Sequence, residues 1–181
     1  MLTRHEQWEA KLHHSIEAHK AKPFAWGEHD CALSVCNHVQ AMTGVDLAAA
    51  FRGQYQSEDA ALAAMGRICQ DATTLEHVVE QLAAQHGIPE IKPLHAQRGD
   101  VVLLDNPAPS TGLNRQALGI VHLSGRHVIV TGPDGLHLLR LVHMRRAWRI
   151  GPLSAGAHIA DGDGRVRFAP LTRTPPTAAQ S

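Results

Sequence analysis

The residues that could do chemistry gather around Cys31. Asp30 precedes this cysteine, and the apolar residues that follow recur at helical spacing on a stripe formed by Val35, Val39 and Met42. The pattern predicts a helix that is capped by Asp30, carries Cys31 in its first turn and ends at Thr43-Gly44, where Gly44 suits the left-handed position after a helix. The positive end of a helix dipole favours thiolate over thiol, so this placement suits a cysteine nucleophile. The alternative interpretation is that Cys31 is a small buried apolar residue.

Several side chains in and before this stretch could bind a metal ion, namely His13, His14, His29, Cys31, Cys36 and His38. Cys31 and Cys36 are separated by four residues, which is not a recognised zinc spacing and does not bring both thiols to one helical face. We therefore expect neither a metal site nor a cofactor.

The stretch also resembles a known family. The sequence Phe24-Ala25-Trp26-Gly27, followed by Asp30-Cys31, is similar to the nucleophile motif of NlpC-type cell-wall cysteine peptidases, which are papain-like. It is more similar still to a branch of small proteins from tailed phages and prophages. In that branch a helix follows, and then the motifs Thr-Gly-x-Asp and Arg-Gly-x-Tyr. The matching segments are Thr43-Gly44-Val45-Asp46 and Arg52-Gly53-Gln54-Tyr55.

The resemblance resumes at residues 98–102 and 117–120, and it extends over residues 8–150 in all. It implies that Cys31 corresponds to the nucleophile and that Trp26, Gly27, Asp30 and Tyr55 lie at the cleft beside it. For Tyr55 we favour the alternative that the ring packs in the core, because large aromatic side chains usually supply core contacts.

The catalytic base is missing from the position that the resemblance implies. In NlpC-type peptidases the base is the histidine of a His-x-Gly-Ile pattern, and the matching residues here are Ala117-Leu118-Gly119-Ile120. The residue that orients the base lies on the next strand, where the register gives Ile129 or Val130. Neither side chain can orient an imidazole, so we expect the peptidase activity to be lost.

Three other histidines are alternative candidates for the base. His127 is the best placed, near the start of the next strand. His122 lies five residues after Ala117, and this odd offset points it to the opposite face of a regular strand. His29 is close to Cys31 in sequence, but we expect its loop to turn it outward.

The chain reads as helices followed by strands. The expected helices are residues 3–19, capped by Thr3, then 31–42, then 57–68, capped by Ser57, and 73–86, opened by a Thr73-x-x-Glu76 capping box. The expected strands are residues 101–104, 116–123, 127–131 and 136–141, with a short edge strand at 148–150. This order predicts an α+β fold. The resemblance implies its papain-like form, in which N-terminal helices, with the cysteine helix among them, pack on a C-terminal antiparallel sheet or half-barrel.

Length and composition limit the classes of function. The 181 residues suit one domain, which we expect at residues 1–150, with a Pro/Thr-rich and flexible extension at 151–181. Lys+Arg and Asp+Glu number 17 each, which argues against nucleic acid and anionic membranes as partners. We expect no membrane insertion and no signal peptide, because no apolar run approaches about 20 residues and the N-terminus is polar. The 14 histidines make the charge sensitive to acid.

Two functions follow. The first is a structural or assembly protein of a phage or prophage tail tip (baseplate), located in the virion, made in the bacterial cytoplasm and bound to other tail-tip proteins. The alternative is an active peptidoglycan-hydrolysing cysteine peptidase, in which Cys31 attacks a peptide-stem amide and His127 acts as a non-standard base.

Overall fold

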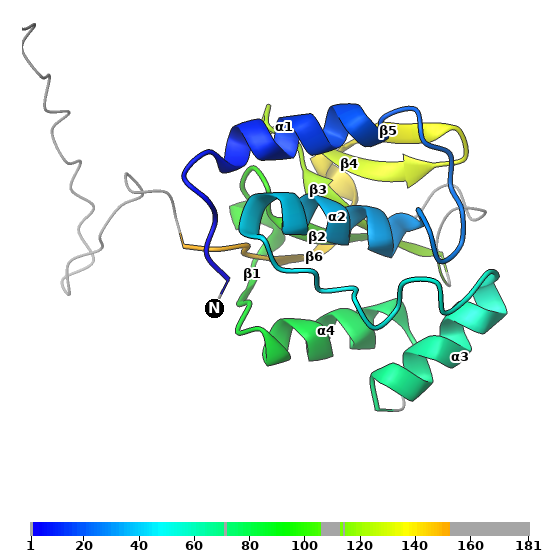
Figure 1. Ribbon diagram of the computed structural model, residues 1–181. Coiled ribbons are helices and arrows are strands. Elements are labelled where there is room, and N and C mark those ends of the chain that lie inside the picture. The colour runs from blue at the N-terminus through cyan, green and yellow to red at the C-terminus, as the bar shows by residue number, and fades with distance from the viewer. Residues whose placement is uncertain (1, 71, 106–112, 114, 153–181) are drawn as a thin grey trace, which may run out of the picture.

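The computed structural model describes residues 2–70, 72–105, 113 and 115–152. Within these ranges the fold is α+β, with four α-helices and one six-stranded antiparallel sheet (Figure 1). The predicted extension lies outside the described residues from position 153 onward. The helices are α1 (Trp8–His19), α2 (Cys31–Thr43), α3 (Glu58–Ile68) and α4 (Leu75–Gln85). The strands are β1 (Glu90–Ile91), β2 (Val101–Asp105), β3 (Gln116–Val121), β4 (His127–Gly132), β5 (Gly135–Arg140) and β6 (Met144–Trp148).

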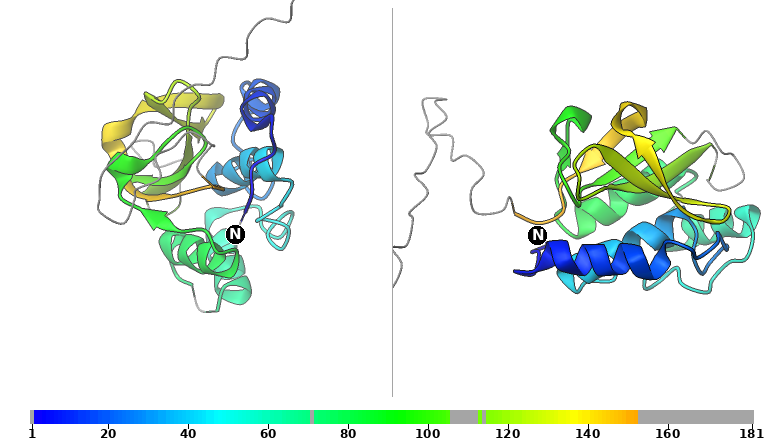
Figure 2. Two further views of the ribbon diagram at one scale, coloured as in Figure 1. Left: turned by 90° about the vertical axis from the view of Figure 1, so that its left-hand side faces the viewer. Right: turned by 90° about the horizontal axis from the view of Figure 1, so that it is seen from above.

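The helices cover one face of the sheet, whose strand order is β1-β6-β2-β3-β4-β5. Helices α1 and α2 lie side by side, with α1 against β5 and α2 against β3 and β4. Helices α3 and α4 lie on the other side of α2 from α1, and the sheet is strongly curved (Figure 2). The helix that begins with the predicted nucleophile therefore occupies the middle of the helical layer.

The predicted start of the first helix is wrong. It begins at Trp8, after Gln7, whose side chain makes no capping hydrogen bond, and residues 3–7 are not helical. The reason is tertiary: Arg4 binds the Asp100 carboxylate at 3.0 Å and the carbonyl oxygens of Arg98 and Ile150. These contacts fix the N-terminal segment across the end of the sheet.

Of the predicted caps of α3 and α4, the first is confirmed and the second is wrong. Ser57 caps α3 as predicted and accepts a hydrogen bond from the Ala60 N–H. The capping box at Thr73 is wrong, because Thr74 is the cap and accepts from His77 N–H at 3.2 Å. Glu76 is drawn away from such a box by Arg146 on β6, which it contacts at 2.8 Å.

Four predicted strands are confirmed to within two residues, and the fifth is wrong. The expected edge strand at 148–150 is β6, which runs from Met144 to Trp148 and lies between β1 and β2. Two consecutive arginines, Arg145 and Arg146, make this strand hard to recognise from the sequence. Arg146 is accommodated on the strand because glutamates on α4 and β1 pair with it. The two-residue strand β1 was not predicted.

The core has two parts, one on each face of the sheet. The larger part lies between helices and sheet and contains Leu12, Met42, Leu103 and Ile120, each with 0% exposure. The smaller part lies on the other face, around Val102, Leu104, Val121, Val128 and Ala147. Strands buried on both faces read as continuous apolar runs, which explains why β2 and β3 were readable from sequence. In the described part of the chain, no helix has the length and apolar character to span a membrane.

Candidate functional site

The start of α2 is built around the buried carboxylate of Asp30. Its Oδ1 accepts hydrogen bonds from the N–H groups of Ala32 at 3.0 Å and Leu33 at 2.9 Å, so Asp30 caps the helix as predicted. Its Oδ2 accepts from the Gly27 N–H at 3.1 Å and from the Tyr55 hydroxyl at 2.7 Å. Four donors thus satisfy a carboxylate that is only 1% exposed. At the other end, Gly44 ends α2 in the left-handed conformation, also as predicted.

The residues that were predicted to lie at a cleft do lie close together, and they are packed against one another. Tyr55 is 5% exposed, which confirms its assignment to the core. Burial, and then Asp30, raise the pKa of the Tyr55 hydroxyl, so it stays a hydrogen-bond donor. Trp26 is half-buried and contacts Tyr55 and Phe24 edge to face, with ring centroids at 6.4 and 4.9 Å. Gly27 has φ +73°, and a Cβ there would lie 2.0 Å from the Tyr55 carbonyl oxygen.

Cys31 is buried in this arrangement, with 2% exposure. Burial is the main reason that its pKa rises to about 12, and the neighbouring Asp30 charge adds to the rise. Backbone hydrogen bonds from Leu118 and from the first turn of α2 favour the thiolate, but they do not offset burial. Of the two interpretations that the sequence left open for Cys31, this burial favours the small buried apolar residue over the nucleophile.

The residues expected to supply a base do not complete a catalytic pair. Ala117 lies on β3 opposite Leu104 and is buried, and a methyl group carries no proton. His127 is the half-buried first residue of β4, where it pairs with Arg140. His122 contacts Ser124 Oγ at 2.9 Å in the β3–β4 turn. Among the described residues, no hydrogen bond or ring contact joins Cys31 to a histidine.

The prediction that His29 turns outward is wrong. Its side chain is fully buried and stacks on His19 of α1, with ring centroids 5.3 Å apart and 13° between the planes. His38 of α2 is 1% exposed, meets His19 edge to face at 5.9 Å, and contacts Ser15 Oγ through Nδ1 at 2.8 Å. Sequence reasoning missed this cluster. Its signal was the position of His38 three residues after Val35, on the apolar stripe of the helix.

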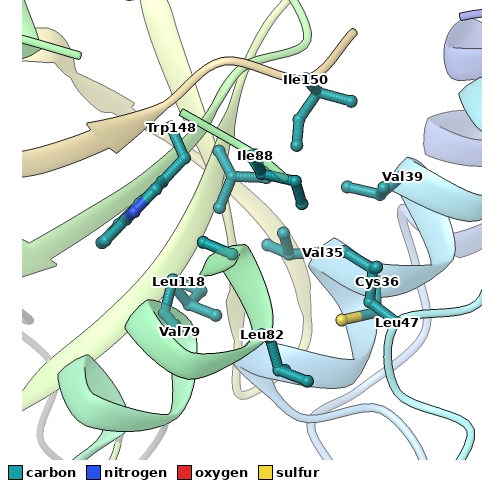
Figure 3. Close-up of a pocket in the computed structure, with 12 residues that line it drawn as sticks. Val35, Cys36, Val39, Leu47, Val79, Leu82, Ile88, Leu118, Trp148 and Ile150 are labelled. Carbon is teal, nitrogen blue, oxygen red and sulfur yellow. The ribbon is translucent and has the colours of Figure 1, made fainter. Parts of the chain in front are cut away.

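An apolar cavity of about 40 Å³ lies between α2, α4 and the sheet (Figure 3). Its lining consists of apolar side chains and Cys36, with Val79, Leu118 and Trp148 among them. A second cavity of similar size, lined by Leu33 and Tyr55, also contacts Cys36 and Leu118. Apolar cavities of this kind stay dry, because water there lacks polar partners. Cys31 lines neither cavity, so neither one delivers a substrate to its sulfur.

The chain matches the family model DUF6950, described as a domain of unknown function, over residues 3–150. The chain belongs to this family. No protein in the curated set matches it. The DUF6950 match spans every helix and strand described here and ends at Ile150, whose N–H contacts Asp100 Oδ1 at 3.2 Å. The family description assigns no activity, so the function has to be argued from the site itself.

Proposed function

We propose that this chain is a structural or assembly protein of a phage or prophage tail tip (baseplate), with a papain-like fold of the NlpC type and a lost peptidase activity. The order of its motifs along the sequence supports the assignment. The packing of α2, which begins with Cys31, against strands β3 and β4 of an antiparallel sheet is compatible with the papain-like arrangement. Its partners are other tail-tip proteins, and its place is the virion after synthesis in the bacterial cytoplasm.

The observation that carries the loss of activity is the state of Cys31. A cysteine peptidase needs a thiolate and a base within hydrogen-bond reach. Here burial holds the pKa of the thiol at about 12, and the position of the base is Ala117. Both requirements are unmet at the place where the resemblance puts them.

A lost activity raises the question of why the nucleophile motif persists, and packing supplies the answer. Asp30 caps α2, Tyr55 binds Asp30, and Gly27 fits beneath the Tyr55 carbonyl oxygen. Each of these motif residues has a structural role that needs no catalysis. The motif is therefore compatible with a binding protein.

The alternative function, a peptidoglycan hydrolase, has two requirements that the proposed function does not have. Cys31 would have to ionise near neutral pH, which burial opposes, and His127 would have to reach it from the start of β4. The experiment that tests the proposed function therefore includes peptidoglycan as a possible substrate.

The test is to co-express the full chain with each tail-tip protein of its own gene cluster and to isolate complexes by affinity and size-exclusion chromatography. Wild type and Cys31→Ala should form the same complex, because the thiol has no chemical role. The second arm incubates both proteins with purified peptidoglycan and measures released peptides.

Failure to bind any tail-tip protein contradicts the assignment to the tail. Release of peptides by wild type and not by Cys31→Ala contradicts the loss of activity and establishes the hydrolase. The two arms thus judge the two halves of the proposal separately.

A further inference from the structure

Three histidines meet where α1, the loop at residues 20–30 and α2 come together. His19 lies at the end of α1, His29 in the loop and His38 on α2, and the ring contacts of His19 join the other two. His19 Nδ1 contacts the Ser15 carbonyl oxygen at 2.7 Å, and His38 Nδ1 contacts the Ser15 hydroxyl. Both ring nitrogens of His29 and Nε2 of His38 are buried without a hydrogen-bond partner. Burying a polar atom without a hydrogen-bond partner costs free energy, so these nitrogens lower the stability of the closed junction.

A metal ion does not explain these free nitrogens. A metal lies near the plane of each imidazole that binds it, and the nearly parallel, stacked rings of His19 and His29 offer no such shared position. Within the described residues, no group of three or more His, Cys, Asp or Glu side chains is arranged to hold a metal ion. In mild acid an imidazole can also take up a proton, on the one ring nitrogen that carries none.

The charged groups around the cluster do not favour protonation. His19 and Lys22 both act against a charge on His29, and His19 and His29 act against a charge on His38. Together with burial, which is the larger cause, they lower the pKa of His29 to about 4 and that of His38 to about 3.

The carboxylates of neighbouring elements are already engaged. Asp30 binds the α2 N–H groups and Tyr55, and Glu17 of α1 pairs with Lys20 at 2.8 Å. On β5, which packs against α1, His137 pairs with Asp134 at 2.6 Å. Glu28, next to His29 in the loop, has an exposed side chain. Asp30, Glu17 and Asp134 thus already have partners of their own and are not free to neutralise a second positive charge in the cluster.

We propose that this histidine cluster is an acid-operated switch, in which protonation of His29 and His38 separates α1 and the start of the loop, at residues 20–24, from α2 and exposes Cys31. Protons reach the cluster from a surface groove lined by Lys11, His14, Ser15 and His19. The charged imidazoles regain hydration only if the junction opens, so acid shifts the equilibrium toward the open form.

The two ends of the loop are tied to different elements. Its start is tied to the sheet by backbone hydrogen bonds from Leu136 N–H to the Lys20 oxygen at 2.9 Å and from Phe24 N–H to the Pro133 oxygen at 3.4 Å. Its end is tied to the cap of α2 by the bond from Gly27 N–H to Asp30 Oδ2 at 3.1 Å, so the junction divides within the loop. Cys31 lies seven residues before His38, about two turns, and so on the face of α2 that parts from α1. This device does not depend on the tail-tip assignment.

The experiment measures labelling of Cys31 in the full chain between pH 7 and pH 4.5. The reagent is 4,4′-dithiodipyridine, which reacts with thiols in mild acid, and mass spectrometry follows each cysteine separately. Each rate is divided by the rate of the same cysteine in the urea-unfolded chain, which removes the intrinsic pH dependence. Cys69, buried beyond the end of α3, is the internal reference.

The normalised rate of Cys31 should rise by about a hundredfold or more between pH 6.5 and pH 5, because each of the two histidines freed by opening contributes at least about tenfold over this range. The rate of Cys69 should stay level over the same range. A level Cys31 rate in the wild-type protein overturns the proposal, and so does a parallel rise of both cysteines, which means global unfolding.

Variants assign the effect to the cluster. His29→Phe combined with His38→Asn, in which the amide can still contact Ser15, should abolish the rise. The matched control His77→Gln, at an exposed position on α4, should retain it. If circular dichroism shows that the double variant does not fold, His38→Asn alone should halve the logarithmic slope. An unchanged slope in that variant contradicts the assignment.

Discussion

The hydroxyl of Tyr55 donates a 2.7 Å hydrogen bond to Oδ2 of Asp30, 25 residues earlier in the chain and inside the core. This contact ties the segment before α3 to the cap of α2. It also explains how a motif typical of a nucleophile can be kept for packing. Because an ionised acceptor makes hydrogen bonds stronger, this pair should be among the larger single contributions to stability.

Tyr55→Phe should lower the free energy of unfolding by about 1.5–3 kcal/mol, the range for a hydrogen bond to a charged group. The same change in an Asp30→Ala background should have almost no effect, because the acceptor is already gone. Urea denaturation of the four members of this double-mutant cycle measures the coupling.

Ser57→Ala is the control, since the exposed Ser57 side chain accepts a single capping bond at 3.3 Å. It should cost about 1 kcal/mol or less. Fully additive effects of Tyr55→Phe and Asp30→Ala would contradict the role given to this hydrogen bond.

Gly27→Ala should destabilise the protein much more than Gly53→Ala. Both glycines have a positive φ, +73° and +70°, so both substitutions meet the same backbone strain of about 1–2 kcal/mol. They differ in space: a Cβ at Gly27 lies 2.0 Å from the Tyr55 oxygen, and a Cβ at Gly53 meets nothing within 4 Å. The clash should add about 1–3 kcal/mol at Gly27 alone. Thermal unfolding compares the stability of the two variants. Equal losses of stability would mean that the loop around Gly27 rearranges at little cost to avoid the clash.

The sequence predicted those features of the fold that local chemistry decides. Asp30 and Gly44 bound α2 because a carboxylate cap and a left-handed glycine act within one turn of the chain. Strands β2 and β3 were found because burial on both faces makes them uniformly apolar. The same local reasoning placed Cys31 in the first turn of its helix.

Long-range contacts decided the features that the sequence did not predict. Arg4 holds residues 3–7 out of the helix by binding Asp100, which lies 96 residues away. Burial of Cys31 against the sheet outweighs the field of its own helix, and the sequence gives no measure of that burial. His29 faces inward because His19 of another helix stacks on it.

Arg146→Met should cost about 2–3 kcal/mol. Its side chain is 20% exposed and binds Glu76 at 2.8 Å, Glu90 at 2.6 Å and also Glu80, which joins α4 and β1 to β6. Without it, three carboxylates face one another. The loss should shrink at high salt, which screens their repulsion.

Arg145→Met is the matched control for this site. Arg145 pairs with Asp105 at 3.0 Å, but both side chains are more than half exposed. Its loss should therefore change stability by about 0.5 kcal/mol or less. Urea unfolding at low and high salt compares the two variants, and equal losses would contradict the importance given to the glutamate cluster.

The thiol of Cys31 should be almost inert in the folded protein. Its pKa of about 12, against an ordinary value of 9.0, leaves the folded state with about a thousandth of the thiolate of the unfolded chain at pH 8. Labelling of Cys31 by iodoacetamide should therefore be at least about a hundredfold slower in the native protein than in urea. Rapid native labelling near pH 7 would contradict the buried thiol and revive the hydrolase.

The same shift makes a prediction about alkaline stability, with a definite sign. The folded-state pKa is raised, so the stabilisation by the neutral thiol is complete below pH 9 and is lost as the pH rises from 9 towards 12. Between pH 8 and pH 10 the free energy of unfolding should fall by about 1.4 kcal/mol for Cys31, and by a similar amount for Cys36, whose pKa burial also raises to about 12. Cys31→Ala should remove about half of this pH dependence while leaving that of Cys36. A variant whose alkaline slope equals that of wild type would mean that Cys31 ionises without opening the core.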